Sequence, residues 1–225
     1  MNMKHPFSLL LLVAGCQAVG SSVPEDRTTD PSAEIAVASQ LVYDVGSLKP
    51  GQWVRYTVKI AGASGTWSVK YACVEEDPEG VWVENKLPAL PRPMVVKSKL
   101  SRDGKLVEQW VGEAGSASPA KTWPLRSAPT KSAGGPAPTE SLHEQAESLT
   151  LAERTYACTK VISVLTYPDK RSSAVENWYS PDVPFTFKSG TRTYGGVARR
   201  RFGRFTMELS AAGTDATPEL QVPPQ

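Results

Sequence analysis

The chain has 225 residues with nearly balanced charge, 25 Lys and Arg against 23 Asp and Glu, and 40% of its residues are hydrophobic. A formal net charge of +2 gives no overall attraction to nucleic acid, and this apolar content is typical of a globular rather than a disordered chain. The length is enough for one domain with a real core. The sequence therefore predicts one folded domain and no nucleic-acid partner.

The chain begins with a segment typical of export signals. Lys4 lies in a short polar start, and a largely apolar run follows over residues 7–14. A helix that spans a membrane needs about 20 consecutive apolar residues, roughly twice the length of this run. The segment therefore predicts a signal peptide and not a permanent span.

The apolar run ends in LVAGC, residues 12–16, which resembles the lipobox of bacterial lipoproteins. In that family the cysteine thiol is joined to a diacylglycerol and the chain is cut just before it. The resemblance implies a signal peptide over residues 1–15 and a membrane anchor on Cys16, where two or three acyl chains would hold the protein stably. Gln17 stands where the family's inner-membrane retention signal has aspartate, so the outer membrane is expected, on its periplasmic face or at the cell surface. The alternatives are an ordinary secretory signal with a coincidental cysteine, or a buried core cysteine.

Residues 16–44 are expected to be the lipidated cysteine and a flexible tether. Residues 17–31 are rich in Ser, Thr, Asp, Pro and Gly and carry few large apolar groups. Ser32 is placed to cap a short helix over residues 33–43, in which Ile35, Ala38 and Leu41 share one face.

Alternation of apolar and polar residues predicts the strands of one β-rich domain over residues 45–213. In the first strand, residues 52–60, Val54, Tyr56 and Val58 face one way. A turn over residues 61–65 leads to a returning strand over residues 67–73. The remaining strands are expected over residues 81–85, 94–100, 106–111, 175–179 and 205–209, with a hairpin that turns at residues 153–154 and continues to residue 167.

Two segments lack this alternation. Residues 113–140 are rich in Ala, Ser, Gly and Pro and predict a long mobile loop within the domain. Residues 214–225 end in Pro-Pro-Gln and predict a disordered tail. With about nine strands and at most one or two short helices, the fold class is mainly β, a curved antiparallel sheet that forms a half-barrel, a barrel or a sandwich.

Three phrases resemble uncharacterised lipoproteins of environmental Gram-negative bacteria. They are Gly51–Tyr56, Tyr156–Val161 and Trp178–Pro184. The resemblance implies a curved sheet like that of outer-membrane lipoprotein carriers, whose concave face holds acyl chains. It brings no known activity, and it leaves acyl chains, a glycan or an envelope protein as partners. The Pro- and Ala-rich loop and the arginine run described next depart from the pattern, which puts the transfer of a ligand in doubt.

Four arginines lie close together at Arg199, Arg200, Arg201 and Arg204. Between Ala152 and Gly213 there are ten basic and five acidic residues, so this part of the chain is basic while the remainder is acidic on balance. A row of arginines can contact anionic lipid headgroups or lipopolysaccharide phosphates. The alternative is that these residues guard an exposed sheet edge against pairing with other strands.

Cys73 and Cys158 lie in the same short phrase, Tyr-Ala-Cys, within predicted strands. An oxidising compartment permits a disulfide between them. The alternative is two separately buried thiols, because unpaired cysteine is among the most buried residue types.

The sequence contains no recognisable catalytic or metal-binding pattern. His143 is the only histidine after the signal segment, so a histidine-based zinc site or a Ser-His-Asp triad is not expected. Carboxylates are the remaining option: Glu84, Glu108 and Glu176 lie on predicted strands, whereas the acidic residues around Pro78 are expected to form a solvated turn. No cofactor is expected.

The six tryptophans are spread along the strands and are expected to fill the core or to cap sheet edges. Trp82 is out of phase with Val81 and Val83 and is the candidate for a ring that faces solvent or a groove. The expected function is a membrane-anchored, non-enzymatic envelope lipoprotein with a binding or structural role. The alternative is a carboxylate-dependent hydrolase of cell-wall or carbohydrate substrates.

Overall fold

The computed structural model describes residues 42–88, 93–115, 120–122, 139–151, 153–166, 168, 170, 172–189 and 192–222. The signal peptide, Cys16, residues 17–41 of the tether and most of loop 113–140 lie outside these residues, so the expectations for them stay predictions. The same holds for the helix expected over residues 33–43, except that Val42 and Tyr43 belong to a strand.

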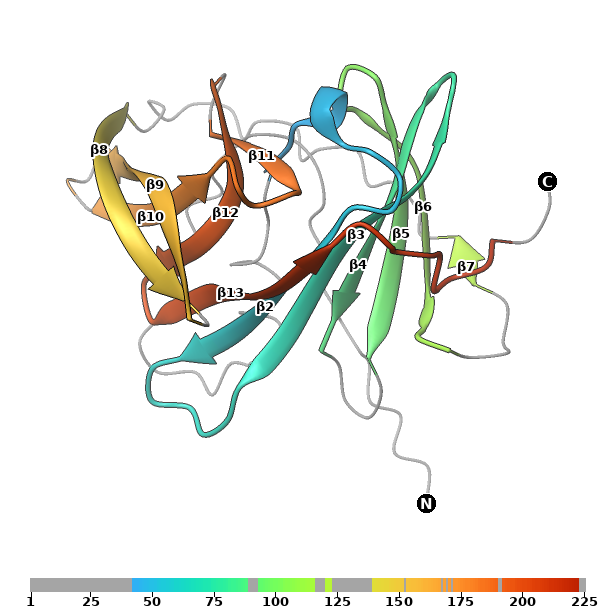
Figure 1. The fold of residues 1–225 in the computed structure, drawn as a ribbon, viewed down its shortest axis with the longest axis horizontal. Coiled ribbons are helices and arrows are strands. Elements are labelled where there is room, and N and C mark those ends of the chain that lie inside the picture. The colour runs from blue at the N-terminus through green and yellow to red at the C-terminus, as the bar shows by residue number, and fades with distance from the viewer. Residues whose placement is uncertain are drawn as a thin grey trace.

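The described residues form one antiparallel sheet of 13 strands and a single 3-10 turn (Figure 1). The elements are β1 (Val42–Tyr43), η1 (Val45–Ser47), β2 (Trp53–Ile60), β3 (Trp67–Asp77), β4 (Gly80–Leu87), β5 (Met94–Ser101), β6 (Leu106–Glu113), β7 (Lys121–Thr122), β8 (Thr139–Leu151), β9 (Arg154–Thr166), β10 (Ser172–Ser180), β11 (Thr186–Ser189), β12 (Arg192–Phe202) and β13 (Phe205–Gly213). Within these described residues, no helix is long and apolar enough to cross a membrane.

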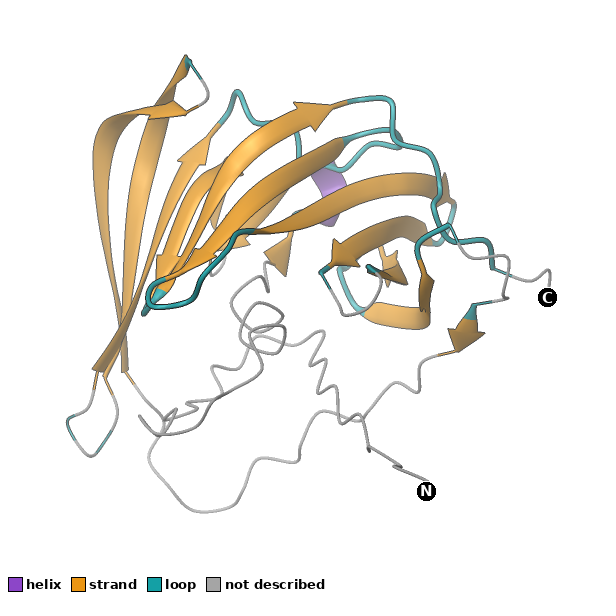
Figure 2. Cartoon of the chain, turned by 90° about the horizontal axis from the view of Figure 1, so that it is seen from below, coloured by secondary structure: helices purple, strands orange, loops and turns teal. Residues whose placement is uncertain are grey.

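The strand order is β7-β6-β5-β4-β3-β2-β13-β12-β10-β9-β8, with β1 and β11 paired beside β12. Most neighbouring strands in this order are consecutive in the chain and form hairpins. The pairing of the last strand, β13, with the early strand β2 is different, because it joins the two halves of the chain. In that pairing Met207 lies opposite Val58. The sheet is not closed, and it bends strongly along its length (Figure 2).

Side chains on a strand point alternately to the two faces of a sheet, so the pairing register assigns each residue to one face. The tyrosine face is the one that carries Tyr56, Tyr71 and Tyr179, and the tryptophan face is the one that carries Trp53, Trp82 and Trp178. The strand pair β1 and β11 packs against the tyrosine face. There the rings of Tyr43, Phe185 and Phe187 lie 5.7 to 6.4 Å from the ring of Tyr71, centroid to centroid.

The mainly β fold class with a curved antiparallel sheet is confirmed. Four strands, β1, β7, β11 and β12, were not predicted from the sequence. In β12 the arginine run hides the apolar alternation, and two glycines lie in the first half of the strand. Gly195 has φ +116°, and a Cβ on Gly195 or Gly196 would collide with the backbone at Ser180 or with Val183, so only glycine permits this close crossing.

The C-terminal segment differs from the disordered tail expected over residues 214–225. Residues 214–222 lie against the tryptophan face, where Leu220 is 4% exposed and packs with Val95 and Ala120. The backbone N–H groups of Glu219 and Leu220 donate to the Glu84 carboxylate at 2.8 and 3.1 Å. The expectation failed because these contacts are made with strands far away in the sequence, which local composition does not reveal.

Candidate functional site

The arginine run does not form one basic surface, because strand alternation divides it between the two faces. Arg199 lies opposite Glu208, Arg200 opposite Met207, and Arg201 opposite Thr206. Arg199 and Arg201 therefore lie on the tryptophan face, and Arg200 lies on the tyrosine face.

Arg199 and Arg201 flank the buried ring of Trp178. Their guanidinium carbons lie 5.6 and 5.5 Å from the ring centroid, and the Lys160 ammonium lies 4.6 Å from it. Arg199 Nε also donates to Glu208 Oε1 at 2.7 Å, and Lys160 Nζ lies 3.3 Å from Glu176 Oε1. Most of the positive charge around this ring is thus neutralised by carboxylates of neighbouring strands.

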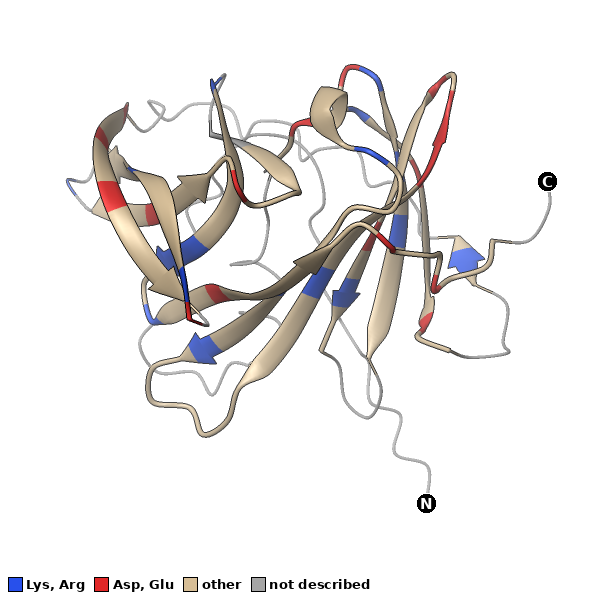
Figure 3. Cartoon of the chain, in the orientation of Figure 1, with Lys and Arg blue, Asp and Glu red and all other residues tan. Residues whose placement is uncertain are grey.

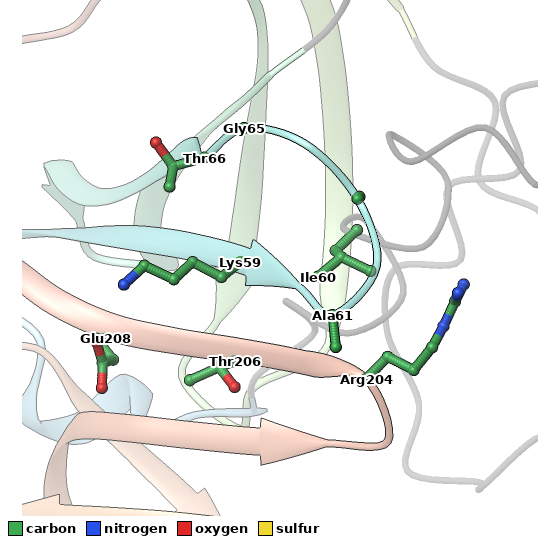
Figure 4. A pocket seen from close by; sticks show the side chains of 9 residues that line it. Lys59, Ile60, Ala61, Gly65, Thr66, Arg204, Thr206 and Glu208 are labelled. Atoms are coloured by element: carbon green, nitrogen blue, oxygen red, sulfur yellow. The ribbon is translucent and has the colours of Figure 1, made fainter.

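The fourth arginine, Arg204, belongs to the β12–β13 turn and lines a shallow hollow of about 400 Å³. Figure 4 shows its side chain pointing away from Lys59 and Glu208, which line the same hollow. These charged groups do not converge on a common point, so the hollow lacks the focused polar groups of a ligand site.

The tryptophan face repeats this pairing of aromatic rings with cations. The Trp82 ring lies 5.3 and 5.9 Å from the ammonium groups of Lys97 and Lys99, and Trp53 has similar neighbours. Lys97 Nζ lies 2.8 Å from a Glu75 carboxylate oxygen. Basic and acidic residues consequently occur on both halves of the sheet (Figure 3), and the basic balance of residues 152–213 does not produce one basic half in the described part.

On the tyrosine face, Arg200 has quite different surroundings. Its Nη1 donates to Asn177 Oδ1 at a long 3.5 Å, and its Nε is buried with no hydrogen-bond partner. Burial lowers the pKa of the guanidinium from its ordinary value. Its electrostatic neighbours among the described residues are the phenols of Tyr179 and Tyr71, and no carboxylate is among them. Arginine nevertheless stays charged in proteins, so a cation is held here among neutral groups.

Tyr56 adds a second unsatisfied group to the same face. Its side chain is fully buried, and its hydroxyl has no hydrogen-bond partner. Burial raises the pKa of this phenol well above its ordinary value, with smaller contributions from Tyr71 and Tyr179, so the hydroxyl keeps its proton. The pairing register places Tyr56, Tyr71, Tyr179 and Arg200 on this one face, and Tyr71 and Tyr179 are electrostatic neighbours of both Tyr56 and Arg200. Arg200, Asn177, Tyr56, Tyr71 and Tyr179 are called the Arg200 cluster below.

The two cysteines are free and buried in the structure, which differs from the disulfide considered above. Cys73 lies in β3 on the tyrosine face and Cys158 in β9 on the tryptophan face. The intervening strands are β2, β13, β12 and β10. Burial raises the pKa of Cys73 to about 12 and that of Cys158 to about 11, so both stay as thiols rather than reactive thiolates at neutral pH.

The carboxylates on strands that the sequence offered as catalytic candidates make hydrogen bonds or ion pairs within the fold. Glu84 is 4% exposed and holds the C-terminal segment, and burial raises the pKa of its carboxyl above the ordinary value. Glu176 pairs with Lys160, and Glu108 accepts a hydrogen bond from the Trp110 indole. His143 is exposed on β8, and no metal-binding group of three or more His, Cys, Asp or Glu side chains occurs among the described residues.

The fold and this site define a protein with one open, curved antiparallel sheet and a buried cationic cluster on one face. No known protein family matches the sequence, and neither a curated protein nor a solved structure shows significant similarity to it.

Sequence reasoning found Arg200 but grouped it with the wrong neighbours. Strand β12 was not expected from the sequence. If residues 196–202 had been assigned to a strand, the alternation of side chains would have placed Arg200 on the face opposite to Arg199 and Arg201. Asn177 and Tyr179 come from β10, which pairs directly with β12. Tyr56 and Tyr71 come from β2 and β3, and the pairing of β13 with β2 brings them to this face.

Proposed function

We propose that the chain is an exported lipoprotein of the bacterial envelope, anchored to the outer membrane through lipid on Cys16, whose folded part binds a ligand or partner and catalyses no reaction. The anchor is supported by the lipobox-like sequence of residues 12–16 after a short apolar run. The folded part then stands off the membrane on the polar segment 17–31.

The contacts of the carboxylates on the strands, Glu84 and Glu176, are the observation on which our choice between a binding function and hydrolysis rests. Carboxylate-dependent glycoside cleavage needs two carboxyl groups about 5 to 10 Å apart, facing each other across a substrate. Glu84 instead accepts two backbone N–H groups, and Glu176 is engaged with Lys160. These contacts support a structural role for both residues, and they favour binding over the hydrolase alternative.

Membrane fractionation tests the anchor. The Cys16→Ala chain should move from the membrane pellet to the soluble fraction, because the thiol that carries the lipid is missing. Cys158→Ala is the matched control: it also removes a thiol, but from a buried strand position, and it should stay in the pellet. Unchanged pelleting of Cys16→Ala, with no acyl mass on the wild-type N-terminal peptide, would refute the anchor.

A turnover assay tests the absence of catalysis. The purified Cys16→Ala chain should release no reducing ends from peptidoglycan or from soluble glycans. Release that disappears in Glu84→Gln or Glu176→Gln would establish the hydrolase instead, since each substitution keeps the shape of the side chain and removes its charge.

A further inference from the structure

Among the described residues, the half-buried cation of the Arg200 cluster has a buried Nε without a partner and no carboxylate opposite it. The residues opposite Arg200 on the flanking strands are Met207 and Asn177, and both are neutral. The nearest charge partners along the sheet, Glu176 and Glu208, lie on the tryptophan face with Lys160 and Arg199. A buried charge that lacks a partner opposes folding, so the described fold on its own gives no reason to keep Arg200.

Three members of the cluster, Arg200, Tyr56 and Asn177, carry proton donors. Arg200 Nε is an N–H with no partner, and the Tyr56 hydroxyl is unpartnered and fully buried. Asn177 is 4% exposed, and because its carbonyl oxygen accepts from Arg200, its amide N–H groups remain as donors. A charged fork flanked by neutral donors is the arrangement that proteins use to bind an oxyanion.

We propose that Arg200, together with Asn177 and Tyr56, binds the carboxylate of an organic acid that has an apolar body. This inference rests on the proposed binding function and names its ligand class. The ligand is a monoanion because one guanidinium charge balances one negative charge, whereas a phosphate dianion would leave a buried charge unmatched. A planar carboxylate also fits the guanidinium fork with two parallel hydrogen bonds.

The apolar body of the ligand follows from what surrounds the cluster. Tyr56 and Tyr71 lie with their rings 5.8 Å apart, and Phe185 and Phe187 pack against Tyr71. These side chains offer ring surface and few further polar groups, so they favour an acyl or aryl group over a sugar. Acyl acids and aryl acids both carry a carboxylate, and the experiment below distinguishes between them.

Calorimetric titration of the Cys16→Ala chain tests the site, with each acid compared with a neutral analogue of the same shape. Decanoate against decanol represents acyl acids, and benzoate against benzamide represents aryl acids. At least one acid should bind about tenfold or more tightly than its neutral analogue, because only the carboxylate gains the charged hydrogen bonds. The preferred pair identifies the source of the carboxylate.

Three variants assign the effect to the cluster. Arg200→Met should abolish the preference for the acid, while Arg201→Met, the neighbouring arginine on the opposite face, should retain it. Tyr56→Phe removes one hydroxyl from a buried ring and should weaken acid binding about threefold to tenfold. Near-ultraviolet circular dichroism should show native packing in each variant.

The inference is overturned if wild type binds both acids no better than their neutral analogues, or if Arg200→Met keeps the preference. Binding of inorganic phosphate as tightly as the better acid would also overturn the choice of a monoanion. None of these outcomes affects membrane fractionation, so a failed carboxylate site and a failed lipid anchor are distinguishable.

Discussion

The two faces of the sheet treat their arginines in opposite ways. On the tryptophan face, Arg199 lies against Trp178 and donates to Glu208, so its charge is matched by a carboxylate. On the tyrosine face, one residue along the same strand, Arg200 has a long hydrogen bond to Asn177 and a buried Nε without a partner. Adjacent positions of β12 therefore hold one satisfied and one unsatisfied cation.

This difference distinguishes a charged residue that stabilises the fold, Arg199, from one that lowers its stability, Arg200. Ion pairs that are part-buried and hydrogen-bonded stabilise a structure modestly, whereas a buried charge without a partner costs stability. Binding residues are commonly kept at such a cost, because a ligand supplies the missing partner and its binding energy. The tryptophan face thus accounts for stability, and the tyrosine face is where a ligand is expected.

The largest effect is expected on the tryptophan face at Glu84. Glu84→Ala should lower the free energy of unfolding by about 2–3 kcal/mol, because two backbone N–H groups of the C-terminal segment lose their acceptor. The control Glu76→Ala removes an exposed carboxylate that pairs with Arg102, and it should change stability by less than about 0.5 kcal/mol. Urea unfolding measures both. Equal effects of the two substitutions would show that the segment after Gly213 does not contribute to the fold.

A smaller effect is expected from the exposed arginines at the turn that joins β12 to β13. If Arg201 and Arg204 contact anionic headgroups, the Cys16→Ala chain should bind anionic vesicles in low salt and release them in high salt. Arg201→Glu with Arg204→Glu should abolish that binding and shift Tm by no more than about 2 °C, because both side chains are exposed.

The control for vesicle binding is Arg102→Glu with Lys105→Glu, which changes the net charge equally at the β5–β6 turn. This variant should still bind vesicles. Wild-type protein that ignores anionic vesicles at low salt would favour the edge-guard interpretation of the arginines over the membrane contact.

The sequence predicts strands well wherever apolar and polar residues alternate without interruption. Residues 52–60 were placed within about one residue of β2, because this strand has one buried and one less buried face. Residues 94–100 were placed within about one residue of β5, although both faces of that strand are buried in its middle. Strand β12 was missed because arginines occupy both of its faces. The strands that pair with it, β10 and β13, were both expected from the sequence, but local alternation did not reveal the strand between them.

The candidate site was less predictable than the fold. The sequence pointed to the arginine run, but which arginine is buried depends on the face that each strand turns to the core. The role of Glu84 was hidden for a similar reason, since its partners are backbone groups more than 130 positions away. Local patterns fix which residues can form strands, and only long-range pairing decides which polar groups meet.

The most direct test of the account compares the melting temperatures of Arg199→Met and Arg200→Met in the ligand-free Cys16→Ala chain. Methionine has a similar length and no charge, so each substitution removes the cation and keeps an apolar side chain. We expect Arg199→Met to lower Tm by about 2–4 °C and Arg200→Met to raise it by about 2–6 °C. A fall in Tm for Arg200→Met as large as that for Arg199→Met would contradict the account, because Arg200 would then have a stabilising partner within the chain.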